Sequence, residues 1–429
     1  MGELAQMLSV AEARARILEH FSSLGGERVP LSAAAGRVLA SDVVATTDLP
    51  PFSNSSMDGY AVRTGEAAGA ATNNPVRLAV SADIPAGSGM PAPLAPGTAA
   101  RIMTGAPVPP GADAVVPVED TDDRRERAGE PAPAAVTIRV APSLGANVRP
   151  AGQDMRAGQT VLQAGTVLSP AAIGVLAAQG VGQVPVHIQP LVAIFSTGDE
   201  LRRVDEDLGP GQIRDTNSYT LAAAAASYGA RVLRLEVAGD RLEAVRARFD
   251  TARQAGAHLI ISSAGVSVGA YDVVKAAVEA DGALGFWRVR MRPGKPLAFG
   301  QVGGVPFFGL PGNPISALVG FEVFVRPALL KLGGRTRWEK LEIVAELLEP
   351  MQSDGRESYQ RVIVERRGEG YVARGSGHQG SAVLSAMVRA NGLLILPEGV
   401  TQANPGERYA VWLLDEAENG LSAHAETAA

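Results

Sequence analysis

The chain has 429 residues, a length that corresponds to about three domains of average size. Its formal net charge of −6, from 39 basic and 45 acidic residues, lacks the basic footprint of a nucleic-acid-binding protein, so we predict no nucleic-acid partner. The absence of cysteine excludes a disulfide framework, a thiolate-ligated metal site and a cysteine nucleophile. It is also compatible with the cytoplasmic location that we predict.

The first 21 residues have the pattern of an amphipathic helix, and we expect no signal peptide there because they lack a basic start and a continuous apolar stretch. Ser9 and Glu12 have the spacing of a capping box at the start of that helix. No apolar run in the chain approaches the roughly 18 residues that a membrane span needs. We therefore predict no membrane association.

Residues 30–146 contain short apolar runs, such as 77–80 and 114–118, that proline and glycine interrupt every few residues. This pattern predicts compact β structure. The charged stretch 121–131 is predicted to be a solvated loop. A helix is expected over 166–180, opening at Ser169 with Pro170 in the first helical position.

From residue 190 the pattern changes to alternating strands and helices. Strands are predicted at 191–196, 231–237, 258–262 and 306–310, and helices at 218–228, 241–255, 272–280 and 315–332. Four alternations predict an α/β domain with a largely parallel sheet. After residue 340 the chain is again strand-like, with runs at 342–345, 361–364, 393–396 and 409–412.

The predicted fold class is therefore a multidomain α/β protein. We divide it into a helical linker domain (1–29 plus 147–189), a β-rich lid domain (30–146), an α/β domain (190–333), a C-terminal β-barrel-like domain (334–418) and a disordered tail (419–429).

Acidic residues follow three strands of the α/β domain. Glu200, Asp240 and Asp272 should converge, because parallel strands place their carboxyl ends on one edge of the sheet. Converging carboxylates repel one another unless a cation or a shared proton intervenes, and all-oxygen ligands favour Mg²⁺. The alternative for each acid alone is a helix cap or a first-turn residue.

Two further segments could bind anions. The loop 265–269 offers backbone N–H groups at a helix start, although a tight turn would explain it equally well. If 286–292 is a strand, Arg288, Arg290 and Arg292 share one face beside Lys295. A basic row beside an acidic edge suits a phosphorylated ligand bridged by a metal, whereas the plainer alternative is a solvated strand face.

The stretch 375–380 matches the G-x-G-x-x-G pattern of dinucleotide-binding proteins. Too few residues follow it to complete a doubly wound domain, so we do not predict a dinucleotide site there. The glycine-rich loop could still contact an anionic ligand.

Taken together, several short segments resemble the molybdopterin molybdenumtransferase family, which includes MoeA-type enzymes and the C-terminal domain of gephyrin. Each segment is short, but all of them occur in the family's order. They are residues 51–63, 102–109, 196–201, 211–217, 265–269 with Asp272, 293–296, 310–317 and 377–381.

The resemblance implies an enzyme that inserts molybdenum from molybdate into adenylylated molybdopterin and releases AMP in a Mg²⁺-dependent reaction. It also implies a homodimer in which the partner subunit presents the lid, together with a molybdopterin adenylyltransferase and molybdoenzyme acceptors as partners. The residues carried over as catalytic are Asp58, Thr104, Glu200, Asp240, Asp272, Arg288 and Arg292, with Glu200, Asp240 and Asp272 as metal ligands. Those carried over as substrate-binding are Asp154, Gly265, Ser267, Gly269, Lys295, Pro311, Gly312, Asn313, Arg361 and Ser381.

The chain departs from the family pattern at three notable positions. Arg288 and Arg292 stand where the family usually has lysine, and Ala264 where it usually has glycine. Two other functions stay open, a molybdopterin adenylyltransferase and a non-catalytic molybdopterin-binding or scaffold protein. A tungstate-selective relative is also compatible with the sequence.

Overall fold

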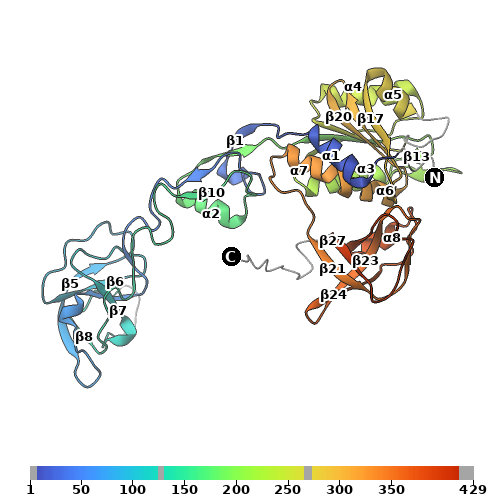
Figure 1. Cartoon of the computed structure of the whole chain (residues 1–429). Coiled ribbons are helices and arrows are strands. Elements are labelled where there is room, and N and C mark those ends of the chain that lie inside the picture. The colour runs from blue at the N-terminus through green and yellow to red at the C-terminus, as the bar shows by residue number, and fades with distance from the viewer. Residues whose placement is uncertain (1–6, 124–129, 265–272, 415–429) are drawn as a thin grey trace. The chain divides into compact units, whose positions relative to one another are not determined.

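The computed structural model describes residues 7–123, 130–264 and 273–414, and only the backbone of 284–287 (Figure 1). The chain divides into two compact units. Unit 1 comprises Met1–Ala40, Gly165–Leu168 and Val184–Ala429, and unit 2 comprises Ser41–Ala164 and Ser169–Gln183. The predicted tail, the loop 265–269 and Asp272 lie outside the described residues. The division into four domains stays a prediction.

Unit 2 is built on a five-stranded sheet in the order β7-β4-β6-β5-β8. Its strands are β4 (Gly59–Val62), β5 (Val76–Ile84), β6 (Thr98–Ile102), β7 (Ala114–Pro117) and β8 (Ala135–Ile138). Every residue of β4 is buried. A Cβ atom on Gly59 would lie 2.0 Å from the carbonyl oxygen of Val116, so only glycine permits this close pairing of β4 with β7.

Unit 2 also contains two short antiparallel ladders and an α-helix. The ladders join β3 (Asn54–Ser55) to β9 (Val148–Arg149) and β2 (Val43–Val44) to β10 (Thr160–Leu162). Helix α2 (Pro170–Ala178) begins as predicted, with Ser169 Oγ accepting a hydrogen bond from the Ala172 N–H and Pro170 in the first turn.

Unit 1 begins with α1 (Val10–Glu19), whose capping box is confirmed. Ser9 Oγ accepts from the Glu12 N–H at 3.2 Å, and Glu12 Oε2 accepts from the Ser9 N–H at 2.8 Å. Strand β1 (Gly26–Pro30) then pairs with β11 (Gln183–His187).

The central sheet of unit 1 has six strands in the order β15-β12-β16-β20-β19-β17. Four of them are parallel neighbours, namely β15 (Arg231–Arg234), β12 (Leu191–Ser196), β16 (Leu259–Ser263) and β20 (Val305–Leu310). The antiparallel strands β19 (Pro296–Val302) and β17 (Gly282–Arg288) extend one edge. The prediction of a largely parallel sheet is confirmed.

Helices cover both faces of this sheet (Figure 1). One face packs against α1, α3 (Asn217–Ser227), α6 (Pro314–Gly320) and α7 (Arg326–Leu332), and the other against α4 (Leu242–Gln254) and α5 (Val273–Asp281). Alternate residues of β12 serve the two cores, with Val192 and Ile194 on one face and Ala193 and Phe195 on the other.

The helix predicted over 315–332 is confirmed, and it consists of α6, a π-helical turn at Phe321–Val325 and α7, which follow one another directly. Glu322 of this turn forms a 2.9 Å ion pair with Lys340, and Arg326 donates hydrogen bonds to the carbonyls of Trp338 and Glu339. The turn therefore anchors the segment that leads into the C-terminal strands.

Those strands form a closed ring. The order of pairing around the ring is β23 (Glu357–Arg367), β24 (Gly370–Gly375), β21 (Glu342–Leu347), β27 (Arg408–Leu413) and β25 (Gly392–Leu396), and β25 pairs with β23 to close it. This ring confirms the predicted β-barrel-like domain. The shorter β22 (Met351–Gln352) and β26 (Gln402–Ala403) pair with each other, and α8 (Leu384–Arg389) follows β24. Strand β18 (Met291–Arg292) pairs in parallel with β23.

The predicted fold class is confirmed by these elements. None of the described helices has both the length and the apolar character to cross a membrane.

Candidate functional site

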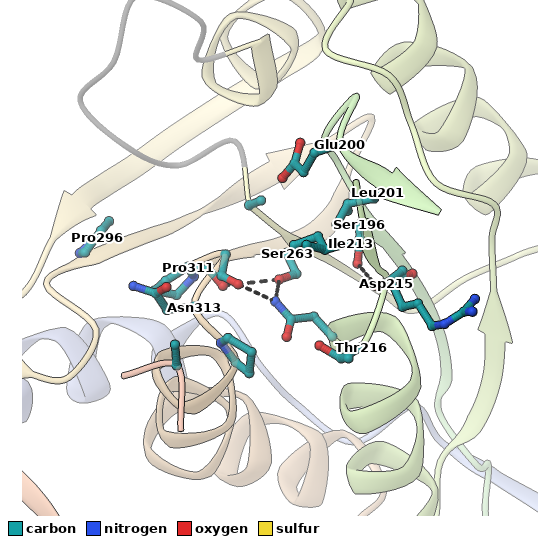
Figure 2. A pocket seen from close by; sticks show the side chains of 16 residues that line it. Ser196, Glu200, Leu201, Ile213, Asp215, Thr216, Ser263, Pro296, Pro311 and Asn313 are labelled. Carbon is teal, nitrogen blue, oxygen red and sulfur yellow. Dashed lines mark hydrogen bonds between the residues drawn. The ribbon is translucent and has the colours of Figure 1, made fainter. Parts of the chain in front are cut away.

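A pocket of about 570 Å³ opens where β12, β16 and β20 end, and we call it the strand-end pocket. Figure 2 shows the side chains that line it. Ser196 and Ser263 are the last residues of β12 and β16, and Pro311 directly follows β20. Ligands of open parallel sheets bind at this edge. The lining residues are Ser196, Glu200, Leu201, Ile213, Arg214, Asp215, Thr216, Asn217, Ser263, Ala264, Pro296, Pro311, Gly312, Asn313, Pro314 and Ala382.

Asp215 is buried at one side of this pocket, with 2% of its surface exposed. Its carboxylate accepts hydrogen bonds from Ser196 Oγ at 2.8 Å, Ser218 Oγ at 2.5 Å and the Ser218 N–H at 3.1 Å. Since both serine side chains are also buried, this network ties the end of β12 to the start of α3.

Asn217 and Ser263 hold the loop that follows β20. Asn217 Nδ2 donates to Ser263 Oγ at 2.7 Å and to the Gly312 carbonyl at 2.8 Å, and Ser263 Oγ donates to the Pro311 carbonyl at 3.1 Å (Figure 2). Although 211–217 and 310–317 carry the family resemblance, sequence reasoning gave no role to Asp215, Asn217, Ser196 or Ser263. Polar residues at the ends of apolar strands were the available signal.

The three acids expected to converge have different surroundings. Glu200 is exposed and lines the strand-end pocket, and its carboxylate folds over Gly198, where an added Cβ would lie 2.5 Å from Oε2. Asp240 is not part of the lining. Its N–H donates to Asp199 Oδ1 at 3.1 Å, on the loop after β12. Asp272 is outside the described residues.

The described residues contain no group of three or more acidic or histidine side chains that could hold a metal ion. Mg²⁺ in phosphate-transfer sites is often held by only one or two carboxylates together with oxygens of the substrate. The hard oxygen donors of Glu200 and Asp240 are of the type that Mg²⁺ prefers, so the chemistry of the described acids fits a magnesium site that the substrate completes.

A second pocket of about 320 Å³ adjoins the first and is rich in cationic side chains, so we call it the cationic pocket. It shares Pro296, Pro311 and Asn313 with the strand-end pocket. The C-terminal ring contributes most of the other side. The lining residues are Arg292, Pro293, Gly294, Lys295, Pro296, Pro311, Asn313, Ser316, Arg356, Tyr359, Gln360, Arg361, Gln379, Gly380 and Ser381.

Arg361 is the most buried cation of this pocket, with 1% of its surface exposed. Its Nη2 donates to the carbonyls of His378 at 3.1 Å and Gly380 at 3.2 Å, whereas Nε has no partner among the described residues. Burial lowers the pKa of Arg361 from its usual value, but a guanidinium stays protonated in proteins. A buried cation with an unused donor is well suited to bind an anion.

Arg356 is partly neutralised by an acid. Its guanidinium contacts the Asp354 carboxylate at 2.5 Å and donates from Nη1 to the Met291 carbonyl at 2.8 Å. Burial opposes ionisation of Asp354, but the hydrogen bonds from Arg356 prevail and lower the pKa of that carboxyl. The pair fixes the end of β18 against the C-terminal ring.

The expected row of three arginines on one strand is wrong. Strand β17 ends at Arg288, and Arg292 belongs to the separate strand β18 because that strand pairs with β23 instead of β19. Arg290 forms a 2.8 Å ion pair with Glu398. Arg292 and Lys295 line the cationic pocket, but Arg288 lines neither pocket.

The glycine-rich stretch 375–380 connects β24 to α8 and contributes to the cationic pocket through Gln379 and Gly380. The Gln379 side chain accepts from the Arg361 N–H and donates to the Arg361 carbonyl, both at 2.9 Å. The strands around the loop are mostly antiparallel, whereas a dinucleotide-binding fold is built on a parallel sheet.

Asp58 and Thr104, which were expected from the lid, and Asp154, which was expected from the linker, lie in unit 2. Asp58 Oδ1 accepts from the Thr104 N–H at 2.7 Å and from Thr104 Oγ1 at 2.8 Å, so these two residues are neighbours. Asp154 is exposed, and its N–H donates to the Leu49 carbonyl at 2.9 Å. The catalytic and binding roles of all three stay predictions.

The α/β domain of this chain matches a known family of molybdopterin-binding domains. Residues 193–331 match the model described as a probable molybdopterin binding domain. Residues 8–180 match the MoeA N-terminal region (domain I and II), and residues 344–414 match the MoeA C-terminal region (domain IV).

Curated relatives cover nearly the whole chain. The molybdopterin molybdenumtransferase 2 of Mycobacterium tuberculosis is 41% identical over 95% of this chain and 99% of its own length. The Haemophilus influenzae molybdopterin molybdenumtransferase is 34% identical over 94% and 98%, respectively. Two solved structures of a MoeA protein from Pyrococcus horikoshii give TM-scores of 0.79 and 0.78 at 31% and 28% identity, covering 96% and 95% of this chain and 100% of theirs. The chain belongs to the MoeA-type molybdopterin molybdenumtransferase family, a family of transferases of molybdenum cofactor biosynthesis.

Proposed function

We propose that this protein transfers molybdenum from molybdate to adenylylated molybdopterin, with hydrolysis of the adenylate and release of AMP. The observation that carries the proposal is the pair of adjoining pockets with a shared wall. The strand-end pocket has the volume of a site for a small organic ligand, and the smaller cationic pocket suits an oxyanion.

The larger substrate would occupy the strand-end pocket, with its pyrophosphate near the loops that carry Glu200 and Asp240. Molybdate would occupy the cationic pocket, where Lys295 and Arg361 supply charge and Ser381 a hydroxyl. With both ligands seated, water adds to the adenylyl phosphorus and the pyrophosphate P–O bond breaks, which releases AMP and leaves the other phosphate on molybdopterin. The two dithiolene sulfurs then bind molybdenum, and one molybdate oxygen leaves as water with the two thiol protons. The protein would act through positioning and charge stabilisation, without a covalent nucleophile.

The reaction is proposed to depend on Mg²⁺ held by Glu200 and Asp240, with Asp272 as a third ligand. The bound cation would neutralise negative charge on the pyrophosphate. The role of Glu200 is supported by its place in the lining of the pocket. Asp58 and Thr104 are proposed to reach the site from the lid of the partner subunit in a homodimer, and Asp154 to assist in substrate binding.

The loop residues Gly265, Ser267 and Gly269 are proposed to bind the substrate's anionic groups through backbone N–H groups. Arg288 and Arg292 keep the charge of the lysines usual in the family but present a two-pronged donor, so turnover or oxyanion preference could differ. A molybdopterin adenylyltransferase and acceptor molybdoenzymes are the proposed partners in a cytoplasmic pathway.

The substitutions Glu200→Gln and Asp272→Asn test the assignment of the acids. Each should reduce AMP release by about 100-fold or more while leaving thermal unfolding unchanged. Glu243→Gln is the matched control, because Glu243 is an exposed acid in the first turn of α4. Wild-type activity in both acid variants would contradict the site.

An adenylyltransferase would instead consume ATP without requiring molybdate. The match of the chain to the MoeA regions on both sides of the α/β domain favours the molybdenum transferase. A scaffold protein would bind the ligand without releasing AMP or consuming ATP, so AMP release and ATP consumption measured together separate all three functions.

A further inference from the structure

The first residue of α3 contacts the two loops that flank the strand-end pocket. Asn217 is 7% exposed, and its Nδ2 donates to Ser263 Oγ at the end of β16 and to the Gly312 carbonyl after β20. Because a carbonyl can only accept, the amide nitrogen must face Gly312, so the orientation of the side chain is fixed. Its Oδ1 has no hydrogen-bond partner among the described residues.

The contact with Ser263 continues to the carbonyl of Pro311, next to Gly312 in the chain. Ser263 is fully buried, and its hydroxyl donates to the Pro311 carbonyl at 3.1 Å. Two successive carbonyls of the loop, those of Pro311 and Gly312, are thereby held by side chains from α3 and β16. The dipoles of these carbonyls would otherwise be free to turn their negative ends toward an anionic ligand.

The loop that they hold is the wall between the two pockets. Pro311 and Asn313 line both, and Asn313 directly precedes α6. At the first turn of α6, the Ile315 N–H donates to the carbonyl of Ser381 at 3.0 Å, and Ser381 lines the cationic pocket. A shift of the loop would therefore change the spacing between the ligands of the two pockets.

We propose that Asn217 is a positioning residue, whose side-chain amide fixes the Pro311–Asn313 wall and so aligns the organic substrate with the oxyanion. The proposal rests on the proposed function for its catalytic consequence. A displacement of about 1 Å in such an alignment can reduce a rate by about 100-fold, and binding of each ligand alone is far less sensitive.

The test is Asn217→Asp in the full-length chain, a substitution that keeps the size of the side chain and removes the amide donor. Deuterium uptake across residues 310–316 should become about tenfold faster. The kcat for AMP release at neutral pH should fall by about 10- to 100-fold, with the KM for adenylylated molybdopterin changed by less than about threefold.

The pH profile separates hydrogen-bond donation from a general structural role. When the introduced carboxyl becomes protonated it can again donate to Gly312, so part of the lost kcat of Asn217→Asp should return as the pH falls. Asn217→Ala should lose activity without this recovery. Ser227→Ala, at the exposed end of the same helix, is the control and should change neither exchange nor kcat.

Unchanged exchange across 310–316 in folded Asn217→Asp would overturn the proposal, as would an activity loss equal to the loss of folded protein. If Asn217→Asp does not fold, Ser263→Ala removes the donor to Pro311 and the acceptor of one Asn217 hydrogen bond but keeps the bond from Asn217 to Gly312, so it should give smaller changes in the same direction. Unchanged exchange and kcat in Ser263→Ala would then overturn it. If the wild-type protein releases no AMP, the proposed function fails, while the exchange measurement still decides the role of Asn217.

Discussion

Ala264 adopts a backbone conformation that side chains other than glycine rarely take. Its φ is 72°, and it directly follows β16 at the edge of the strand-end pocket. The left-handed region costs an L-residue about 1 kcal/mol or more. The departure from the family's usual glycine therefore introduces strain at a position beside the proposed substrate.

The substitution Ala264→Gly should relieve this strain and leave the free energy of unfolding unchanged or higher by up to about 1 kcal/mol, because the added freedom of the unfolded chain offsets part of the gain. Urea unfolding measures it. The control Ala223→Gly, at an exposed position within α3, should lower stability by about 1 kcal/mol. An equal loss of unfolding free energy in Ala264→Gly and Ala223→Gly would contradict a strained conformation at Ala264.

Arg361 should determine affinity for the oxyanion. We expect Arg361→Gln to raise the KM for molybdate at least about tenfold, because a buried cation with an unused donor is lost. Steady-state kinetics with varied molybdate gives this value. Arg374→Gln is the control, since Arg374 lies on the adjacent strand β24 and pairs with Glu365. A KM for molybdate equal to that of the wild type in Arg361→Gln would contradict the placement of the oxyanion in the cationic pocket.

Single site residues could be predicted from the sequence only where they belong to a motif of the family and their residue type suits a catalytic or binding role. Asp58 with Thr104, Glu200 and Arg361 could be selected from the family resemblance. Asp215 and Asn217 could not, because an acid or amide before a helix is most often a simple cap. Their role depends on contacts with residues 19 to 95 positions away in the chain.

At the scale of elements, β23 provides the clearest test of electrostatics. Glu357 begins this strand, and burial raises the pKa of its carboxyl above the usual value of 4.5, although the hydrogen bond from the Tyr359 hydroxyl acts in the opposite direction. The folded state therefore holds the proton more tightly than the unfolded state. The contribution to stability is lost as the pH rises through the raised pKa.

The substitution Glu357→Gln should therefore stabilise the protein relative to wild type at neutral pH, with the difference vanishing below about pH 4. Thermal unfolding between pH 4 and 8 measures this difference. Glu365→Gln, an exposed position on the same strand, should show no such pH dependence. A stability difference that is constant with pH would contradict a raised pKa.

Most elements could be predicted because their patterns are local. The alternation of apolar runs and helical segments located β12, α3, β15, α4, β16 and β20 within a few residues. The π-helical turn between α6 and α7 could not be predicted, because the apolar pattern over 315–332 indicates a helix and does not distinguish a π turn from the α-helix around it. The separation of β18 from β17 likewise depends on pairing with β23, more than 60 residues later.

At the scale of the whole molecule, the proposed homodimer can be tested by mixing inactive variants. If the partner's lid completes each site, Asp58→Asn and Glu200→Gln subunits would each be inactive alone. Half of a random mixture would be mixed dimers with one intact site, so about one quarter of wild-type activity should return. AMP release after co-refolding measures it. No recovery, in mixtures shown to contain mixed dimers, would mean that lid and pocket act within one subunit.

The most direct test of the central claim is AMP release from adenylylated molybdopterin in the presence of Mg²⁺, measured with and without molybdate. The two adjoining pockets predict release that depends on molybdate, because catalysis requires the oxyanion in the cationic pocket beside the substrate in the strand-end pocket. Tight binding of adenylylated molybdopterin without AMP release at any molybdate concentration would contradict the proposed molybdenum transfer.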